Sequence, residues 1–364
     1  MERKLKERLL QATQHGDIKI VQKAVDECKG ISTSWADSQL NKSCDTVVHL
    51  AVRHGHVNVF QYLCNSSCNL EKQNTNGKRP IHEAAHFGQT ECLRLLLENG
   101  VQVDSLKRAD WTPLMLACTK KNKDIITLLL EHGANPGLKN KDGWNSFHIA
   151  CREGHMDIIS SLLNWKKDLW DTKSNNRRTP LHTAALHGHR EVVEFLVSHC
   201  DYPSDVTDSC GTTPFMDAVR TGDIPVADLL LRKHQANPAK GDNSGYQAIH
   251  IAAQTGHSET VQFLITKCNV SINSSTHNGI TPLHIAAKEG QVEVIKTLVE
   301  NGACLNAVDS KGRTALHIAC GACHPAAART LLQSGADPQV KDQSNRTPFE
   351  MTSSMDILHL STVN

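Results

Sequence analysis

The first pattern that could do chemistry is His82-Glu83-Ala84-Ala85-His86, which matches H-E-x-x-H in this 364-residue sequence. On a helix this spacing puts two histidines one turn apart, where they can bind zinc while the glutamate acts as a base. However, His82 is in register with six other histidines that have no such partner, and no third ligand is apparent. We therefore interpret His82 as a structural residue and predict no metal site; a zinc hydrolase is the alternative.

A second pair, Cys320 and Cys323, forms C-x-x-C, a spacing that can serve redox or metal chemistry. Tetrahedral zinc needs four ligands, and only one such pair occurs. Cys320 also takes a small-residue position that Cys118 and Cys151 occupy elsewhere, so we predict a buried small side chain. The sequence contains no phosphate-binding glycine loop and no nucleophilic serine turn. We predict that the chain is not an enzyme and binds no cofactor.

A period of 33 or 34 residues runs through most of the chain and must position these side chains. Thr before Pro starts a helix, paired small residues such as Ala184-Ala185 let helices approach closely, and Gly290 ends a helix with positive φ. A second apolar helix and a turn dipeptide such as Asp142-Gly143 complete each unit. The position of the histidine in Thr-Pro-Leu-His recurs at His49, His82, Met115, His148, His182, Met216, His250, His284 and His317.

These units resemble the ankyrin repeat, whose signature is T-P-L-H-x-A-A; residues 281–290 form the best copy, and the likeness spans roughly residues 40–350. The resemblance implies an all-α fold, an ankyrin-repeat solenoid of helix pairs with β-hairpin fingers. Because end repeats need more polar outer faces, we predict a single solenoid over 1–364 with caps at both ends. Its parts are an N-terminal capping unit at 1–30, a loop at 31–44, nine repeats at 45–344 and a C-terminal capping unit at 345–364.

The composition restricts the classes of function. Lys and Arg number 39 against 38 Asp and Glu, so no overall field favours nucleic acid or an anionic membrane. No run of 18 apolar residues and no secretory signal is apparent. The 13 scattered cysteines indicate reduced thiols, and we expect a soluble protein in the cytoplasm, with the nucleus as a further location. We predict a monomer with a protein partner, no membrane association and no direct sequence-specific nucleic-acid binding.

The residue just before each Thr position should lie on a finger tip, and these residues should form a row along the repeats. Trp, Arg and Tyr are the types most enriched in interface hot spots. We therefore predict a partner-binding site centred on Trp111 and Trp144; the alternative is that each Trp packs on its own finger. The row reads Lys78, Trp111, Trp144, Arg178, Thr212, Tyr246, Ile280, Arg313 and Arg346. Of these, Lys78, Arg178 and Tyr246 are further candidate binding residues.

A parallel row, three residues earlier, contains Arg108 and Lys141 in the two repeats that carry the tryptophans. Residues 101–178 hold 13 Lys and Arg against 9 Asp and Glu, so this tract is basic. Arg108 joins the candidate binding residues. Charges of this kind are often only a solvated face, but beside the tryptophans they indicate a partner with an acidic or nucleotide-bearing surface.

Residues 103–115 and 138–148 further resemble an ankyrin protein that is understood as a partner of alanyl-tRNA synthetase. This resemblance implies binding to the catalytic domain of the synthetase and acceptance of misactivated serine on three lysines, without turnover. Lys141 matches one of these lysines, whereas Arg108 and Asp171 stand at the other two places. Lys107, Lys139 and Lys173 lie one or two residues from those places and are candidate substitutes.

Only a neutral amine can attack an acyl-adenylate, so an acceptor lysine needs a lowered pKa. We expect Lys139 near Lys141, and Lys107 beside Arg108, to lower the pKa of each acceptor amine through like charge. The alternative function is a general ankyrin scaffold that binds another protein through finger tips and concave face, with no acyl acceptance.

Overall fold

The computed structural model describes residues 2–29, 39–66 and 68–363. The chain divides into two compact units, unit 1 at Met1–Asn175 and unit 2 at Asn176–Asn364, each of which is described by itself. Residues 31–38 of the predicted loop at 31–44 lie outside the described residues. Within the predicted capping unit at 1–30, the described residues 2–29 form a helix pair.

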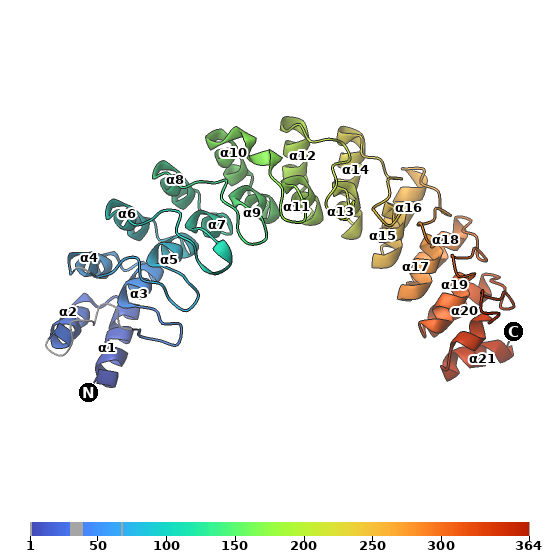
Figure 1. The fold of residues 1–364 in the computed structure, drawn as a ribbon, viewed down its shortest axis with the longest axis horizontal. Helices are drawn as coiled ribbons and strands as arrows, with labels where there is room; N and C mark the ends of the chain where they lie inside the picture. The colour runs from blue at the N-terminus through green and yellow to red at the C-terminus, as the bar shows by residue number, and fades with distance from the viewer. Residues whose placement is uncertain (1, 30–38, 67, 364) are drawn as a thin grey trace. The chain divides into compact units, whose positions relative to one another are not determined.

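The described residues of unit 1 form helix pairs (Figure 1, blue to green). The first helices of the pairs pack against one another in one layer, and the second helices pack in another. The first helices are α1 (Glu2–His15), α3 (Val47–Arg53), α5 (Pro80–Phe87), α7 (Pro113–Cys118) and α9 (Ser146–Glu153). The second helices are α2 (Ile18–Lys29), α4 (Val57–Asn65), α6 (Thr90–Glu98), α8 (Lys123–Glu131) and α10 (Met156–Trp165). Two 3-10 turns, η2 (Arg108–Asp110) and η3 (Lys167–Asp171), lie in connections.

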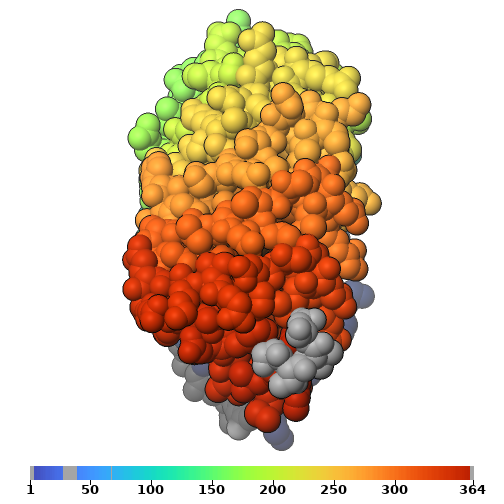
Figure 2. All heavy atoms as spheres, turned by 90° about the vertical axis from the view of Figure 1, so that its right-hand side faces the viewer, coloured from blue at the N-terminus to red at the C-terminus, as the bar shows by residue number. Residues whose placement is uncertain are grey.

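Unit 2 repeats the same two-layer arrangement, and its successive repeats form the yellow, orange and red bands of Figure 2. The first helices are α11 (Pro180–Leu186), α13 (Pro214–Arg220), α15 (Ala248–Thr255), α17 (Pro282–Glu289) and α19 (Ala315–Gly321). The second helices are α12 (Arg190–His199), α14 (Ile224–His234), α16 (Ser258–Thr266), α18 (Val292–Glu300) and α20 (Pro325–Gln333). A short 3-10 turn, η4 (Pro348–Met351), and α21 (Met355–Val363) follow.

The all-α prediction is confirmed. Across residues 2–29, 39–66 and 68–363 no helix is both long and apolar enough to cross a bilayer. The predicted hairpin fingers are tight turns rather than strands: the described residues contain one isolated β-bridge, between Lys107 and Trp111. The reason is that a single antiparallel pair of backbone contacts closes each turn, which is too few to extend a ladder.

Six first helices begin with a histidine version of a capping box: α3, α5, α11, α15, α17 and α19. In α17 the Thr281 N–H donates to Nδ1 of His284 at 3.2 Å, and the His284 N–H donates to the Thr281 hydroxyl at 3.4 Å. Nε2 of His284 then donates to the carbonyl of Arg313, in the next repeat, at 2.9 Å. The repeat histidine therefore joins its own helix start to the following finger, and burial lowers its pKa.

Small side chains and glycines allow the repeats to approach closely. Ala184 and Ala185 are fully buried in α11, which packs against α13. Gly290 ends α17 in the left-handed conformation with φ 71°. Cys323 stands where α17 has its capping glycine and adopts φ 59°, so the backbone keeps this geometry even without glycine.

The finger at Asn140 shows how the tips are built. The Asn140 side-chain oxygen accepts from the backbone N–H groups of Asp142 and Trp144 at 3.0 and 2.9 Å. Gly143 has φ 79°, and a Cβ there would lie 2.5 Å from the backbone nitrogen of Asn175. Glycine is therefore required both by the turn and by the close approach of the next finger.

Candidate functional site

His82 and Glu83 of the H-E-x-x-H pattern are engaged in the repeat structure, whereas the buried Nδ1 of His86 has no hydrogen-bond partner among the described residues. Nδ1 of His82 accepts from the Arg79 N–H at 3.1 Å, and Nε2 donates to the Ser105 carbonyl at 3.0 Å. Burial lowers the pKa of His82 to about 4. The Glu83 carboxylate pairs with Arg53 at 3.0 Å and with Lys78 at 3.3 Å. Neither nitrogen of His82 is available to a metal, and Glu83 is held as an ion-pair partner rather than as a free base.

The cysteine pair is also explained by packing. Cys320 is fully buried in α19, and burial raises the pKa of its thiol to about 12, whereas Cys323 is exposed. A thiol that stays protonated is a poor nucleophile and a poor metal ligand. Within the described part of the chain, no group of three His, Cys, Asp or Glu side chains could hold a metal ion.

Three consecutive repeats of unit 1 each place a cation against an aromatic ring, and we name these pairs the aromatic–cation row. Each separation is within the range of a favourable cation–π contact. The pairs are Arg53 with Phe87 at 6.0 Å, Lys107 with Trp111 at 5.3 Å, and Arg152 with Trp144 at 5.6 Å from the ring centroid. Both predicted tryptophans are partly exposed, and Phe87 is 49% exposed.

Lys107 has the most distinctive environment of the four candidate acceptors. Burial lowers the pKa of its amine, the charge of Lys78 lowers it further, and Glu83 partly opposes both. The like charge comes from Lys78 in the preceding repeat, whereas we expected Arg108 to supply it. The finger is also irregular, because Ala109 and Asp110 both adopt left-handed φ, 64° and 60°. Two consecutive non-glycine residues in this region store backbone strain, which often accompanies a functional site.

The other candidate lysines occupy two different places. Lys141 is exposed at a finger tip, where its N–H donates to the Ala109 carbonyl at 3.1 Å. Lys139 and Lys173 line one polar groove together with Asp171, and the Lys139 amine donates to the Lys173 carbonyl at 2.8 Å. The structure thus brings Lys139 to Lys173, a contact across 34 residues that the spacing of Lys139 and Lys141 did not suggest.

Several charged residues of the predicted finger row are already paired. Arg178 contacts the carboxylates of Asp208 and Asp217 at 3.1 and 2.6 Å. Arg313 and Arg346 pair in the same way with Asp309 and Asp342, each four residues earlier. Arg108 is exposed, and its backbone N–H donates to the Asn76 carbonyl at 3.0 Å.

Unit 2 instead offers an apolar groove of about 440 Å³ beside its fingers. Tyr246, Ile280, Ile285, Ile318 and Met351 supply its apolar lining. The polar groups along it are satisfied within the chain: Arg313 by Asp309, Lys288 by Glu289, and both ring nitrogens of His284 and His317 by their capping boxes and the next finger.

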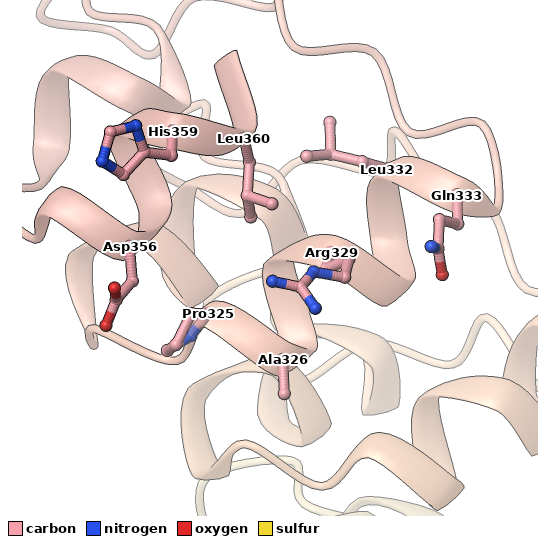
Figure 3. Close-up of a pocket in the computed structure, with 8 residues that line it drawn as sticks. All are labelled: Pro325, Ala326, Arg329, Leu332, Gln333, Asp356, His359 and Leu360. Carbon is pink, nitrogen blue, oxygen red and sulfur yellow. The ribbon is translucent and has the colours of Figure 1, made fainter. Parts of the chain in front are cut away.

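A further cavity of about 670 Å³ lies between α20 and α21 (Figure 3). Arg329 from α20 and Asp356 from α21 lie on either side of Pro325, with Leu332 and Leu360 beyond (Figure 3). None of the residues predicted to bind or react lines this cavity. It therefore adds no support for the predicted site.

Sequence reasoning missed Phe87, Arg152 and Lys166. Phe87 and Arg152 lie near the ends of first helices, five residues after His82 and four residues after His148, so no single repeat position would have identified both. Lys166 lines the same groove as Lys139 and Lys173, and only the folded backbone brings these residues together.

A family profile described as ankyrin repeats (3 copies) matches residues 9–107, 66–140, 114–205, 200–276 and 249–342. The chain belongs to the ankyrin-repeat family. Among curated proteins it is 34% identical over 69 residues to human protein phosphatase 1 regulatory subunit 27, covering 19% of this chain and 45% of that protein. It is 27% identical over 82 residues to mouse protein phosphatase 1 regulatory subunit 12A, covering 22% of this chain and 8% of that protein. These matches span less than half the length of either relative.

Membership in this family makes the chain a protein-interaction module, since ankyrin repeats stack into extended binding surfaces. Proteins of this type are typically non-enzymatic scaffolds. Two surface features described above could take part in such binding: the aromatic–cation row of unit 1 and the apolar groove of unit 2.

Proposed function

We propose that this ankyrin protein binds the catalytic domain of alanyl-tRNA synthetase and accepts misactivated serine on lysine side chains. Its central tract, residues 103–115 and 138–148, closely resembles ankyrin repeat domain-containing protein 16. The observation that carries the proposal is the environment of Lys107, whose amine is partly buried, has a lowered pKa and lies over Trp111 in a strained finger. The proposed site of action is the cytoplasm, with the nucleus as a further location.

The chemistry needs a neutral amine close to an activated acyl group. The lysine ammonium first loses a proton to solvent, and its lone pair then attacks the carbonyl carbon of seryl-adenylate. An N–C bond forms to the carbonyl carbon, and the bond between that carbon and the bridging phosphate oxygen breaks. Adenosine monophosphate leaves with the bonding electrons, and the attacking nitrogen releases a second proton. A lowered pKa raises the fraction of neutral amine, and docking on the synthetase supplies the effective concentration.

Lys107, Lys139, Lys141 and Lys173 are the proposed acceptors, and none of them regenerates after reaction. Arg108 and Asp171 cannot react in this way, because guanidinium stays protonated and a carboxylate is no amine. Lys107 supplies the missing amine next to Arg108, and Lys173 supplies it two residues from Asp171.

The experiment combines binding with mass mapping. The full chain is incubated with alanyl-tRNA synthetase, ATP and serine, and tryptic peptides are searched for serine on these four lysines. Replacing all four by Arg keeps the charge and removes the nucleophiles, so synthetase binding should persist while acylation disappears. Lys341→Arg in unit 2 is the matched control. If the synthetase binds and serine never appears on lysine, the acceptor role is wrong and only a binding role remains.

The second candidate is a general adaptor that accepts no acyl group, and the apolar groove of unit 2 favours it. Two of the relatives are named as regulatory subunits of protein phosphatase 1, so a phosphatase is one partner to test. Purified catalytic subunit of that phosphatase can be titrated with the full chain. Phosphatase binding that Ile280→Asp abolishes, without binding of the synthetase, would replace the first candidate with the second.

A further inference from the structure

A polar groove of about 420 Å³ in unit 1 carries charges of both signs. One wall comes from the finger before α9, with Gly137, Lys139 and Asn145. The other wall is the end of α10 and the η3 turn. It contributes Lys166, Asp168, Leu169, Asp171, Thr172 and Lys173.

Two contacts hold amines at this groove. The Lys139 amine donates to the Lys173 carbonyl at 2.8 Å, which ties the two walls together. The Lys166 amine lies close to the backbone at Gly137, where a Cβ would be 3.3 Å from Nζ. Lys166 also contacts Asp168, at 4.0 Å, which is too long for a strong pair. Gly137 thus leaves room for an amine that a side chain would crowd.

The charges restrict which ligand fits. A simple anion would meet the carboxylates of Asp168 and Asp171, and a simple cation would meet the three lysine amines. A ligand that carries both an ammonium and a phosphate satisfies both sets.

We propose that this groove binds an aminoacyl-adenylate directly, with the phosphate on the lysine amines and the α-ammonium on Asp168 and Asp171. The inference rests on the proposed function and deepens it, because it assigns the intermediate a site on this chain. Asp171, which cannot accept an acyl group, then gains a role in orienting the ligand. Lys139 and Lys173 would lie beside the bound acyl group.

The test uses the full chain without synthetase and a stable analogue, 5′-O-(N-L-seryl)sulfamoyladenosine, titrated by calorimetry at low salt. We expect saturable binding, with adenosine monophosphate and serine each binding at least about tenfold more weakly. Asp168→Asn with Asp171→Asn should weaken analogue binding by about tenfold, since each exposed ion pair contributes modestly. The same variant should leave binding of adenosine monophosphate unweakened. Glu300→Gln, an exposed acid in unit 2, is the matched control.

Three outcomes would overturn the inference: no saturable binding of the analogue, equal binding by the double Asn variant, or equal binding of an N-acetylseryl analogue that lacks the ammonium. A parallel pull-down with synthetase separates the two proposals. If synthetase binds and lysines are acylated while the isolated chain ignores the analogue, the groove assignment fails and the proposed function stands. If the analogue binds and the synthetase does not, the proposed function fails and the groove assignment stands.

Discussion

Each unit buries one carboxylate at the same repeat position, directly after the repeat histidine or methionine. In unit 1, burial opposes ionisation of Glu83, but Arg53 and Lys78 outweigh it and hold the pKa of Glu83 below its ordinary value. In unit 2, burial of Asp217 and the like charge of Asp208 outweigh the attraction of Arg178 and Arg220 and raise the pKa of Asp217 to about 6. One backbone position therefore gives pKa shifts of opposite sign, according to whether the ion pairs and hydrogen bonds of the carboxylate outweigh its burial.

The fingers differ in a related way. Asn74 and Asn140 cap their turns in unit 1, whereas Asp208, Asp242, Asp309 and Asp342 take this place in unit 2. Both residue types accept the same backbone N–H groups, but only Asp adds a charge. Asp309 and Asp342 use that charge to hold the arginine four residues later. In unit 1, Lys107 lies over the ring of Trp111, and Arg152, which also pairs with Glu153, lies over the ring of Trp144.

The largest expected effect tests whether the aromatic–cation row alone binds the partner. Trp111→Ala with Trp144→Ala should weaken synthetase binding by about 4 kcal/mol, because truncating a hot-spot residue commonly costs about 2 kcal/mol or more. The thermal midpoint should change little. Ile280→Ala, at the same row position in unit 2, is the control and should leave synthetase binding intact. An equal loss of folding stability would mean that the tryptophans are core residues.

Removing the carboxylate of unit 1 should cost folding stability. Glu83→Gln leaves Arg53 and Lys78 without their shared partner, and breaking a buried ion pair costs about 3 kcal/mol. Urea unfolding measures the free energy. Glu98→Gln, an exposed acid in α6, should be neutral. Unchanged stability of the Glu83 variant would show that the two cations are adequately solvated without it.

The pH dependence distinguishes the two carboxylates. The pKa of Asp217 is about 6 when folded and 3.8 as the ordinary value, so the folded state keeps a proton that the unfolded state has lost. Its contribution to the free energy of unfolding should therefore fall by about 3 kcal/mol as pH rises from 4 to above 6. Glu83 has the opposite effect, because its pKa is lowered in the folded state. Its contribution to the free energy of unfolding is present above pH 4.5 and is lost as the pH falls below that value. Unfolding of Asp217→Asn across this range should lack the decline; an unchanged pH profile contradicts the assignment.

Packing should not distinguish the units. Ala85 in α5 and Ala185 in α11 occupy the same repeat position and are both fully buried. Leucine at either should destabilise by roughly 1 to 3 kcal/mol through overpacking. Thermal melts of the two variants should agree closely. A melt unaffected by Ala185→Leu would mean that the register is wrong, and a large difference between variants would show that the units also differ in packing.

The smallest effect concerns an exposed arginine of unit 2. Arg346 is half exposed and pairs with Asp342, so Arg346→Ala should change stability by less than about 0.5 kcal/mol. It should also leave synthetase binding unchanged, because its charge is already neutralised. Loss of synthetase binding in this variant would mean that the partner binds unit 2 rather than the aromatic–cation row of unit 1.

Much of the local structure could be predicted from the sequence. The repeat spacing, the Thr-Pro starts, the paired alanines and the left-handed Gly290 all appear where expected, since each depends on residues a few positions apart. The tryptophans were located on the fingers, but their cations were not all identified. Arg152 contacts Trp144 from the C-terminal end of α9. The left-handed backbone of Ala109 and Asp110 could not be predicted either, because neither residue type favours positive φ as glycine does.

The amino-acid sequence by itself specifies the helix pair, because the caps, turns and apolar stripe that form it all lie within one repeat of 33 or 34 residues. The charge state of each side chain and the residues that it contacts depend on the tertiary structure. Glu83 finds Arg53 thirty residues away, Arg178 reaches Asp217 across 39, and Lys139 reaches Lys173 across 34. Such contacts depend on how neighbouring repeats stack and on how much water that stacking removes, and the free energy of a charge varies steeply with both.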